Sequence, residues 1–231
     1  MRVAEPHYPA SPELAISHAR YFNGDLKIVP GVHLPLRSML IDGASRILVS
    51  PIDTVDERRA ASGLLDAIVA PSLLHGIYTK IARDRHRPRA VWGPPGFAAK
   101  HPELGPVRTL GVDPWPFIEQ LDFEVVAGAP KRQEVVFFHS PSRTIYTADV
   151  VFNLGEPEGL IAPLVYRLMG VYKRLAMPKL WSRWITDKAA FRRSMDRILA
   201  WDFDRIAVAH GELVASGGHD RFEKALAERL D

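Results

Sequence analysis

Three residues that can bind a metal ion or transfer protons each follow a predicted strand. His75 comes shortly after a buried apolar run, Asp149 closes a strand in the middle of the chain, and His210 closes the last strand. The carboxyl ends of strands are where open α/β sheets place their ligands. Imidazole and carboxylate groups are also the commonest cysteine-free ligands of Zn, Mn and Fe, and they serve as general acids and bases. The three residues therefore form a candidate catalytic and metal-binding set.

A purely structural interpretation stands beside this one. A His-Gly pair after a strand often forms a turn whose imidazole bonds to backbone groups, and an Asp at a strand end often caps the segment that follows. Spacing along the chain leaves both interpretations open. The order of the surrounding elements supplies further evidence.

The elements that must position these residues are short strands separated by helices. A turn at Asp42-Gly43 predicts a β-hairpin, and Thr54 is the expected N-cap of the first helix. The predicted strands are 25–30, 38–42, 46–50, 66–70, 89–92, 123–127, 134–139, 144–148 and 205–209. The predicted helices are 54–65, 72–85, most of 160–200, and a C-terminal helix ending near 230. Two strand-rich halves, each followed by helices, indicate a layered α/β sandwich.

The order of these pieces resembles the metallo-β-lactamase superfamily, and more narrowly an uncharacterised bacterial branch that has lost much of its metal motif. The resemblance spans about 25–230. Its pieces are SMLIDG followed by ILVSPID, then IVAPSLLH, EVVFFHSPSRTIYTAD and IAVAHG. It implies an α/β fold of the αββα sandwich type, forming a single domain over 25–231 after an irregular segment at 1–24, with a helical insertion at about 155–200.

The resemblance carries the family's metal ligands over only in part. The His-x-His-x-Asp-His box falls on residues 70–75, Ala-Pro-Ser-Leu-Leu-His, so only its last ligand remains, at His75. The bridging Asp matches Asp149 and the last His matches His210, whereas a further His falls around residues 130–131 and is absent. Three of the family's seven ligand positions are occupied. A standard two-zinc centre is therefore excluded, because each ion normally needs three or four protein donors.

Two functions follow from the reduced motif, and the sequence leaves both open. In the first, the chain is a metal-dependent, hydrolase-like protein: His75, Asp149 and His210 hold one weakly bound Zn, Mn or Fe ion, and Asp149 orients the water. In the second, the same pocket binds a ligand without metal and without catalysis, in a binding or scaffold protein. Serine hydrolase chemistry is not expected, because the chain has no G-x-S-x-G motif and Ser72 and Ser142 lack an adjacent base motif.

The segment 160–197 differs in charge from the rest of the chain. It contains nine Lys or Arg and two Asp, a net charge of +7 where the whole chain carries +3. We expect lid helices with solvated basic faces. As a lid, Arg167, Arg174 and Trp181 would contact a small anionic ligand, and His33, in an early loop, would border the same pocket. Attachment of this basic, aromatic segment to a membrane surface is the less favoured alternative.

Composition excludes several other classes of protein. The chain has 231 residues, of which 47% are apolar, enough for one substantial core. The absence of cysteine excludes disulfides, thiolate metal sites and thiol catalysis, and is compatible with a cytoplasmic location. A net charge of +3 argues against a nucleic-acid partner. We also expect neither a secretory signal nor a spanning helix, since no run of about 18 apolar residues occurs.

Overall fold

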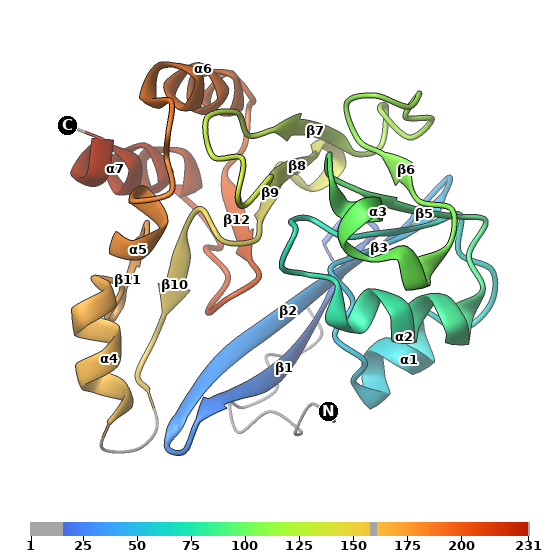
Figure 1. Ribbon diagram of the computed structural model, residues 1–231, viewed down its shortest axis with the longest axis horizontal. Coiled ribbons are helices and arrows are strands. Elements are labelled where there is room, and N and C mark those ends of the chain that lie inside the picture. The colour runs from blue at the N-terminus through green and yellow to red at the C-terminus, as the bar shows by residue number, and fades with distance from the viewer. Residues whose placement is uncertain (1–15, 158–160, 231) are drawn as a thin grey trace.

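Two mixed β-sheets face each other in the computed structural model, which describes residues 16–157 and 161–230. Helices cover the outer side of each sheet (Figure 1). The first sheet has the order β1-β2-β3-β4-β5-β6 and consists of β1 (Ala19–Val29), β2 (Val32–Asp42), β3 (Arg46–Val49), β4 (Ala67–Val69), β5 (Ala90–Gly93) and β6 (Arg108–Thr109). The second sheet has the order β12-β9-β8-β7 and consists of β7 (Asp122–Val125), β8 (Val135–His139), β9 (Thr144–Thr147) and β12 (Arg205–Val208).

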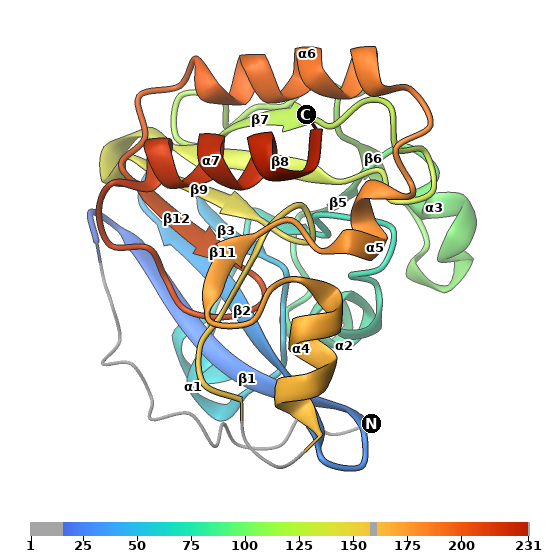
Figure 2. The same cartoon turned by 90° about the vertical axis from the view of Figure 1, so that its left-hand side faces the viewer.

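The helices divide between the two outer faces. Those beside the first sheet are α1 (Val55–Ala60), α2 (Ile77–His86) and α3 (Phe97–Lys100). On the other side, α6 (Lys188–Leu199) and α7 (Gly218–Leu230) cover the second sheet and α5 (Lys179–Ser182) contacts α7, whereas α4 (Ala162–Met169) packs against β2. Figure 2 shows α6 and α7 side by side over the second sheet. This arrangement confirms the predicted αββα sandwich.

The first sheet contains both antiparallel and parallel strand pairs. β1, β2 and β3 pair antiparallel, while β3 to β6 pair parallel. The three residues of β4 are all inaccessible to solvent, as expected for a parallel strand covered on both faces. Side chains of both sheets, among them Met39, Val69, Phe137 and Tyr146, fill the space between them. The removal of this apolar surface from water is the main stabilising contribution.

Several predicted elements are confirmed, with shifted ends. The hairpin through Asp42 pairs β2 with β3, and the Thr54 side chain accepts a hydrogen bond from the backbone N–H of Glu57 as the N-cap of α1. β1 begins at Ala19, so residues 19–24 are not irregular as expected. These residues form part of β1 because the pairing of β1 with β2 continues as far as Ala19 and Ile41. Residues 1–15 of the expected irregular segment lie outside the described residues.

The expected helical insertion contains one strand, whose partner strand lies just before it. Within 155–200 lie α4, α5, α6 and β11 (Arg174–Ala176), which pairs antiparallel with β10 (Phe152–Leu154). Residues 158–160 lie outside the described residues. Throughout residues 16–157 and 161–230, none of the helices combines the length and apolar character needed to cross a bilayer.

Candidate metal centre

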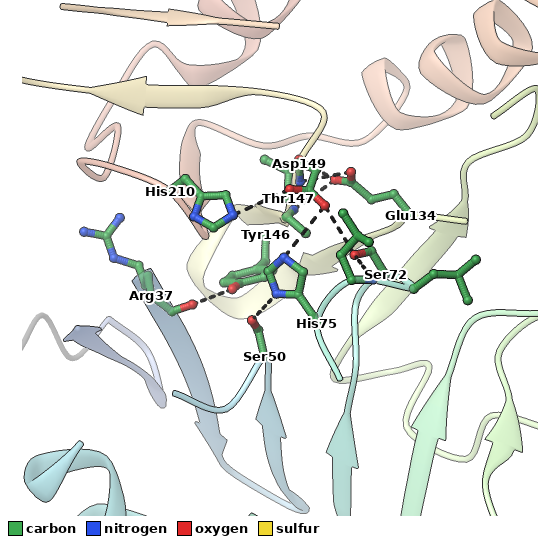
Figure 3. Close-up of polar contacts among 12 residues, drawn as sticks. Arg37, Ser50, Ser72, His75, Glu134, Tyr146, Thr147, Asp149 and His210 are labelled. Atoms are coloured by element: carbon green, nitrogen blue, oxygen red, sulfur yellow. Dashed lines mark hydrogen bonds and ion pairs between the residues drawn. The ribbon is translucent and has the colours of Figure 1, made fainter. Parts of the chain in front are cut away.

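His75, Asp149 and His210 converge at one edge of the sandwich. One ligand atom from each residue can be chosen so that all three lie within 4.8 Å of one another. The Nε2 atom of His210 lies 3.5 Å from Oδ1 of Asp149, and Nε2 of His75 lies 3.8 Å from Oδ2 of the same carboxylate (Figure 3). The structure thus brings together all three residues that the sequence selected from strand ends.

Strand pairing explains this convergence. β9 and β12 are parallel neighbours, with Thr147 opposite Val208, so the residues that follow them reach the same sheet edge. Asp149 and His210 each stand two residues beyond these partners. His75 follows β4 of the facing sheet. Residues 72–76 form a turn after this strand, so α2 begins only at Ile77. The predicted helix at 72–85 therefore begins later, and the delay leaves His75 in the site.

Both imidazole rings are oriented by hydrogen bonds at Nδ1. Nδ1 of His210 lies 2.9 Å from the backbone oxygen of Pro35, and a carbonyl oxygen can only accept, so this nitrogen donates. Nδ1 of His75 lies 2.8 Å from the hydroxyl of Ser50. In each ring Nε2 is left facing Asp149. Metal-binding histidines are commonly oriented in this way, with the second ring nitrogen tied to a carbonyl or another polar group.

Ser50 was not selected from the sequence. It directly follows β3 and adopts a left-handed backbone conformation, with φ of 53°, which few residues other than glycine occupy. Its side chain is buried and lines the cavity beside the site. The signal that could have identified it is the same strand-end position that selected His75, Asp149 and His210, applied to a hydroxyl residue.

The loop that carries Asp149 is held by a second buried carboxylate. Glu134 is inaccessible to solvent, and its Oε2 accepts a hydrogen bond of 2.9 Å from the backbone N–H of Asp149. Its Oε1 accepts from the backbone N–H of Ala148 and from the hydroxyl of Thr147, both at 2.9 Å. Ser72 donates to Oδ2 of Asp149 at 3.3 Å. These contacts fix the position of the Asp149 carboxylate between the two histidines.

The site favours metal-binding protonation states. Burial lowers the pKa of His75 to about 4, with the charges of His210 and Arg132 acting in the same direction and Asp149 opposing them. Burial alone would raise the pKa of Asp149, but the polar contacts of its carboxylate with His210 and His75 and the positive charge of Arg132 lower it below its usual range. Burial and the charge of Asp149 raise the pKa of Glu134. At neutral pH, His75 therefore offers a lone pair and Asp149 a charged oxygen.

Arg132 brings a positive charge to the same edge. Its guanidinium packs over the ring of Trp184, 3.3 Å from the ring centre, and its backbone oxygen accepts a hydrogen bond of 3.0 Å from the N–H of Leu73. Its charge lowers the pKa of both His75 and Asp149. Arg132 directly follows residues 130–131, where the resemblance places a missing histidine ligand.

The donor set fits one metal ion and does not supply two. Two imidazole nitrogens and one carboxylate are a common ligand set for Zn, Mn or Fe with open positions for water or substrate. The other box positions are Ala70, Ser72 and Leu74. The first and last have no donor atom in the side chain, and the Ser72 hydroxyl bonds to Asp149. These three positions therefore supply no further metal ligands.

A cavity of about 220 Å³ adjoins the three residues. The polar residues of its lining are His75, Asp149 and His210 together with Ser50, Arg37 and Tyr78. The rest of the lining is largely apolar and comes mostly from the β1–β2 hairpin, the segment after β3 and the start of α2. The cavity therefore offers a polar end beside the histidines and an apolar wall opposite.

The other residues predicted to bind substrate lie outside this lining. His33, on β2, pairs through Nδ1 with Asp25, and its backbone oxygen accepts a hydrogen bond from the Tyr166 hydroxyl. Its neighbour Leu34 is the residue that reaches the cavity. His33 thus connects β2 to α4.

The three residues selected from the insertion have separate surroundings. The exposed Arg167 packs over the ring of Tyr172, 4.2 Å from the ring centre, and Arg174 forms an ion pair of 3.0 Å with Glu228. Trp181 is only 1% exposed and belongs to the core beneath α6 and α7. None of the three is among the cavity-lining residues within the described part of the chain.

No protein-family model matches the sequence, and no curated protein matches it either. The structure, in contrast, is similar to several solved structures. DIM-1 metallo-β-lactamase is similar over 100% of both chains, with a TM-score of 0.65 and 12% identity. A metallo-β-lactamase from Erythrobacter litoralis is similar over 93% of this chain and 88% of its own, with a TM-score of 0.59 and 15% identity.

Flavodiiron proteins are also similar in structure. The flavodiiron core of Flv1 from Synechocystis sp. matches 94% of this chain with a TM-score of 0.67 and 12% identity, and this chain spans only 59% of its length. Identities this low report on the backbone arrangement and not on activity. On the full-length matches, the chain has the metallo-β-lactamase fold. Two histidines and one aspartate that could hold one metal ion, His75, Asp149 and His210, lie at one edge of the sandwich, called the metal edge below.

Proposed function

We propose that this chain is a metal-dependent, hydrolase-like protein that binds a single divalent ion through His75, Asp149 and His210 and acts on a small anionic substrate. The observation that carries the proposal is the orientation of the two imidazoles. Both direct Nε2 toward one carboxylate while Nδ1 is tied to a buried partner. Zn, Mn and Fe suit this donor set.

A bound ion would polarise the substrate and lower the pKa of a coordinated water. The chain's own residues would position the reactants. The lowered pKa of Asp149 makes its carboxylate a weak base, so it would mainly orient the water by accepting a hydrogen bond. Ser50 and the Pro35 carbonyl would hold the rings, and the apolar cavity wall would limit the access of bulk water.

The test is metal content joined to activity. Protein purified without chelator is assayed for metals, stripped, and titrated with Zn, Mn and Fe, and each form is assayed on a panel of anionic esters, lactones and phosphodiesters. We expect one ion per chain and hydrolysis that depends on it. Protein that takes up none of the three metals would overturn the proposal. The matched control is His86→Gln, which changes a histidine of α2 that does not line the cavity.

A metal-free binding or scaffold protein is the second candidate, and Arg132 favours it. This guanidinium already places a positive charge near Asp149 and His75, where an ion would otherwise supply it. Neutralising the charge distinguishes the candidates, because Arg132→Gln should tighten metal binding if the ion belongs in the site. If neither the wild-type protein nor Arg132→Gln takes up metal, and both still bind ligand, the metal-free function is supported.

A further inference from the structure

A buried arginine lines the same cavity and belongs to no part of the metal site. Arg37 lies on β2, two residues after Pro35, and is 5% exposed. In Figure 3 its guanidinium lies on the far side of the His210 ring from Asp149. One end of the cavity therefore holds the histidine and aspartate group, and Arg37 contributes a separate positive charge.

The partners of this guanidinium are neutral. Nε donates to the Asn23 side-chain oxygen at 3.0 Å, and Nη1 lies 3.5 Å from the backbone oxygen of Val208. Among the described residues, no carboxylate forms an ion pair with Arg37. Its Nη2 donates no hydrogen bond to any of these residues. The exposed Glu212 acts on it only at longer range. Burial lowers the pKa of Arg37 to about 10, so the group stays charged at neutral pH.

A structural role explains only part of this arrangement. The backbone oxygen of Arg37 accepts a hydrogen bond of 2.6 Å from the Tyr146 hydroxyl, which ties the two sheets together, but any residue could supply that oxygen. The bond to Asn23 would be equally available to a neutral amide. A buried cation without a counter-charge costs free energy, and such groups are usually paired. A cation that instead lines a cavity is suited to pairing with a ligand.

We propose that Arg37 recognises the anionic group of the molecule that enters this cavity. The ligand would be a small amphiphilic carboxylate or phosphate whose charged oxygens meet Nη2 and whose apolar part lies against residues such as Leu36, Ile52 and Tyr78. Guanidinium groups match the planar geometry of these anions. The inference rests on the proposed function only in that the same molecule would present its reacting bond to His75, Asp149 and His210.

Wild-type protein is first titrated with hexanoate, hexanamide and hexyl phosphate by calorimetry. These probes share one chain length, and the first two differ chiefly in charge. We expect hexanoate to bind at least about tenfold more tightly than hexanamide, because a charged hydrogen-bonded pair is then formed in a buried site. Comparing hexanoate with hexyl phosphate assigns the anion as carboxylate or phosphate.

The variant Arg37→Met keeps an unbranched side chain, shorter than that of arginine, and removes its charge. We expect it to lose the preference for hexanoate, while Arg89→Met, which removes a charge from an exposed arginine outside the cavity, keeps it. Near-UV circular dichroism verifies folding. If Arg37→Met does not fold, Arg37→Lys replaces it, with weaker binding of hexanoate expected because the planar fork is lost.

Equal affinity of wild-type protein for hexanoate and hexanamide would overturn this inference. So would a folded Arg37→Met variant, or its Lys replacement, that binds hexanoate as tightly as wild type. Metal uptake is measured in the same preparations and separates the two proposals. Anion binding through Arg37 without any metal uptake would remove the metal-dependent function and leave this inference in place.

Discussion

The metal edge and the basic insertion were both selected from the sequence, and they are built in opposite ways. At the metal edge, Asp149 and His210 are 6% and 5% exposed, and each side chain has defined partners. In the insertion, Arg167 and Arg174 lie on the surface and contact the neighbouring Tyr172 and Glu228. Buried polar groups must be paired to be tolerated, whereas exposed charges are satisfied by water. Burial thus separates a preorganised site from a charged surface.

The largest effect should come from removing a ligand. His210→Ala leaves two donors, and we expect metal affinity to fall at least about 100-fold, because an ion of this type normally needs three or more protein donors. Titration of the stripped protein with Zn measures this. The control His86→Gln should bind as wild type does. Undiminished Zn uptake by His210→Ala would mean that the ion binds elsewhere and that the metal edge is not a preorganised metal site.

Loss of Glu134 should cost about 3 kcal/mol of folding free energy. Glu134→Gln replaces one of the two acceptor oxygens by an amide N–H₂, so the backbone N–H of either Ala148 or Asp149 faces another donor and loses its acceptor in a buried place. Urea unfolding monitored by circular dichroism measures the change. The exposed Glu223→Gln should stay within about 0.5 kcal/mol of wild type. A similarly small effect at Glu134 would mean that the Asp149 loop is held by other contacts.

The pH dependence of stability should reveal the neutral histidines. Burial lowers the pKa of both His75 and His139 from 6.5 to about 4, so folding favours their neutral forms. The stabilisation is complete above pH 6.5 and is lost as the pH falls toward 4, at up to about 1.4 kcal/mol per pH unit for each histidine. Denaturant unfolding of chelator-treated protein across this range checks it. His75→Gln should remove one of the two contributions, and an unchanged slope would contradict the assigned burial.

A smaller effect is expected from the residue that orients His75. Ser50→Ala removes the hydroxyl 2.8 Å from Nδ1, and loss of such a partner typically costs about 10-fold in metal affinity. The measurement is again metal titration. Ser182→Ala, in the exposed turn of α5, is the matched control and should not alter binding. Equal metal affinity of Ser50→Ala and Ser182→Ala would show that the Ser50 hydroxyl does not contribute to metal binding by His75.

The smallest effect should follow changes in the insertion. The double variant Arg167→Ala, Arg174→Ala removes an exposed cation–π contact and an exposed ion pair, and such contacts contribute at most about 1 kcal/mol each. We expect hexanoate affinity to change less than twofold. A larger loss would show that these side chains reach the ligand, as the charge pattern of the sequence first indicated.

The architecture could be predicted because the apolar runs and their turns carry most of the information about layers and strand order. The three candidate ligands could be predicted for a related reason, since parallel neighbours such as β9 and β12 end at one edge. Arg37 could not be recognised in this way. It stands in β2 between the buried Leu36 and Ser38, and strand alternation gives no sign that both faces of this strand are covered.

Glu134 illustrates a second limit. Its position before β8 is apparent from the sequence, but its role depends on three donors from residues 147–149, which reach it only after β8 and β9 have paired. Contacts between segments distant in sequence determine which polar residues become buried. The composition of 160–197 likewise indicates charge but not which side chains would meet a ligand.

Gly211 connects the insertion to the third ligand. Its φ of +120° and its close approach to β10 exclude a side chain, since a Cβ atom would come within 2.1 Å of the Asn153 oxygen. Asn153 in turn bonds through its backbone to His210 at 3.1 Å and to Glu212 at 2.8 Å, and β10 pairs with β11. Any displacement of the β10–β11 ribbon would therefore be transmitted to the His210 backbone before it reached His75, so the two imidazoles would respond unequally to mechanical disturbance of the surface.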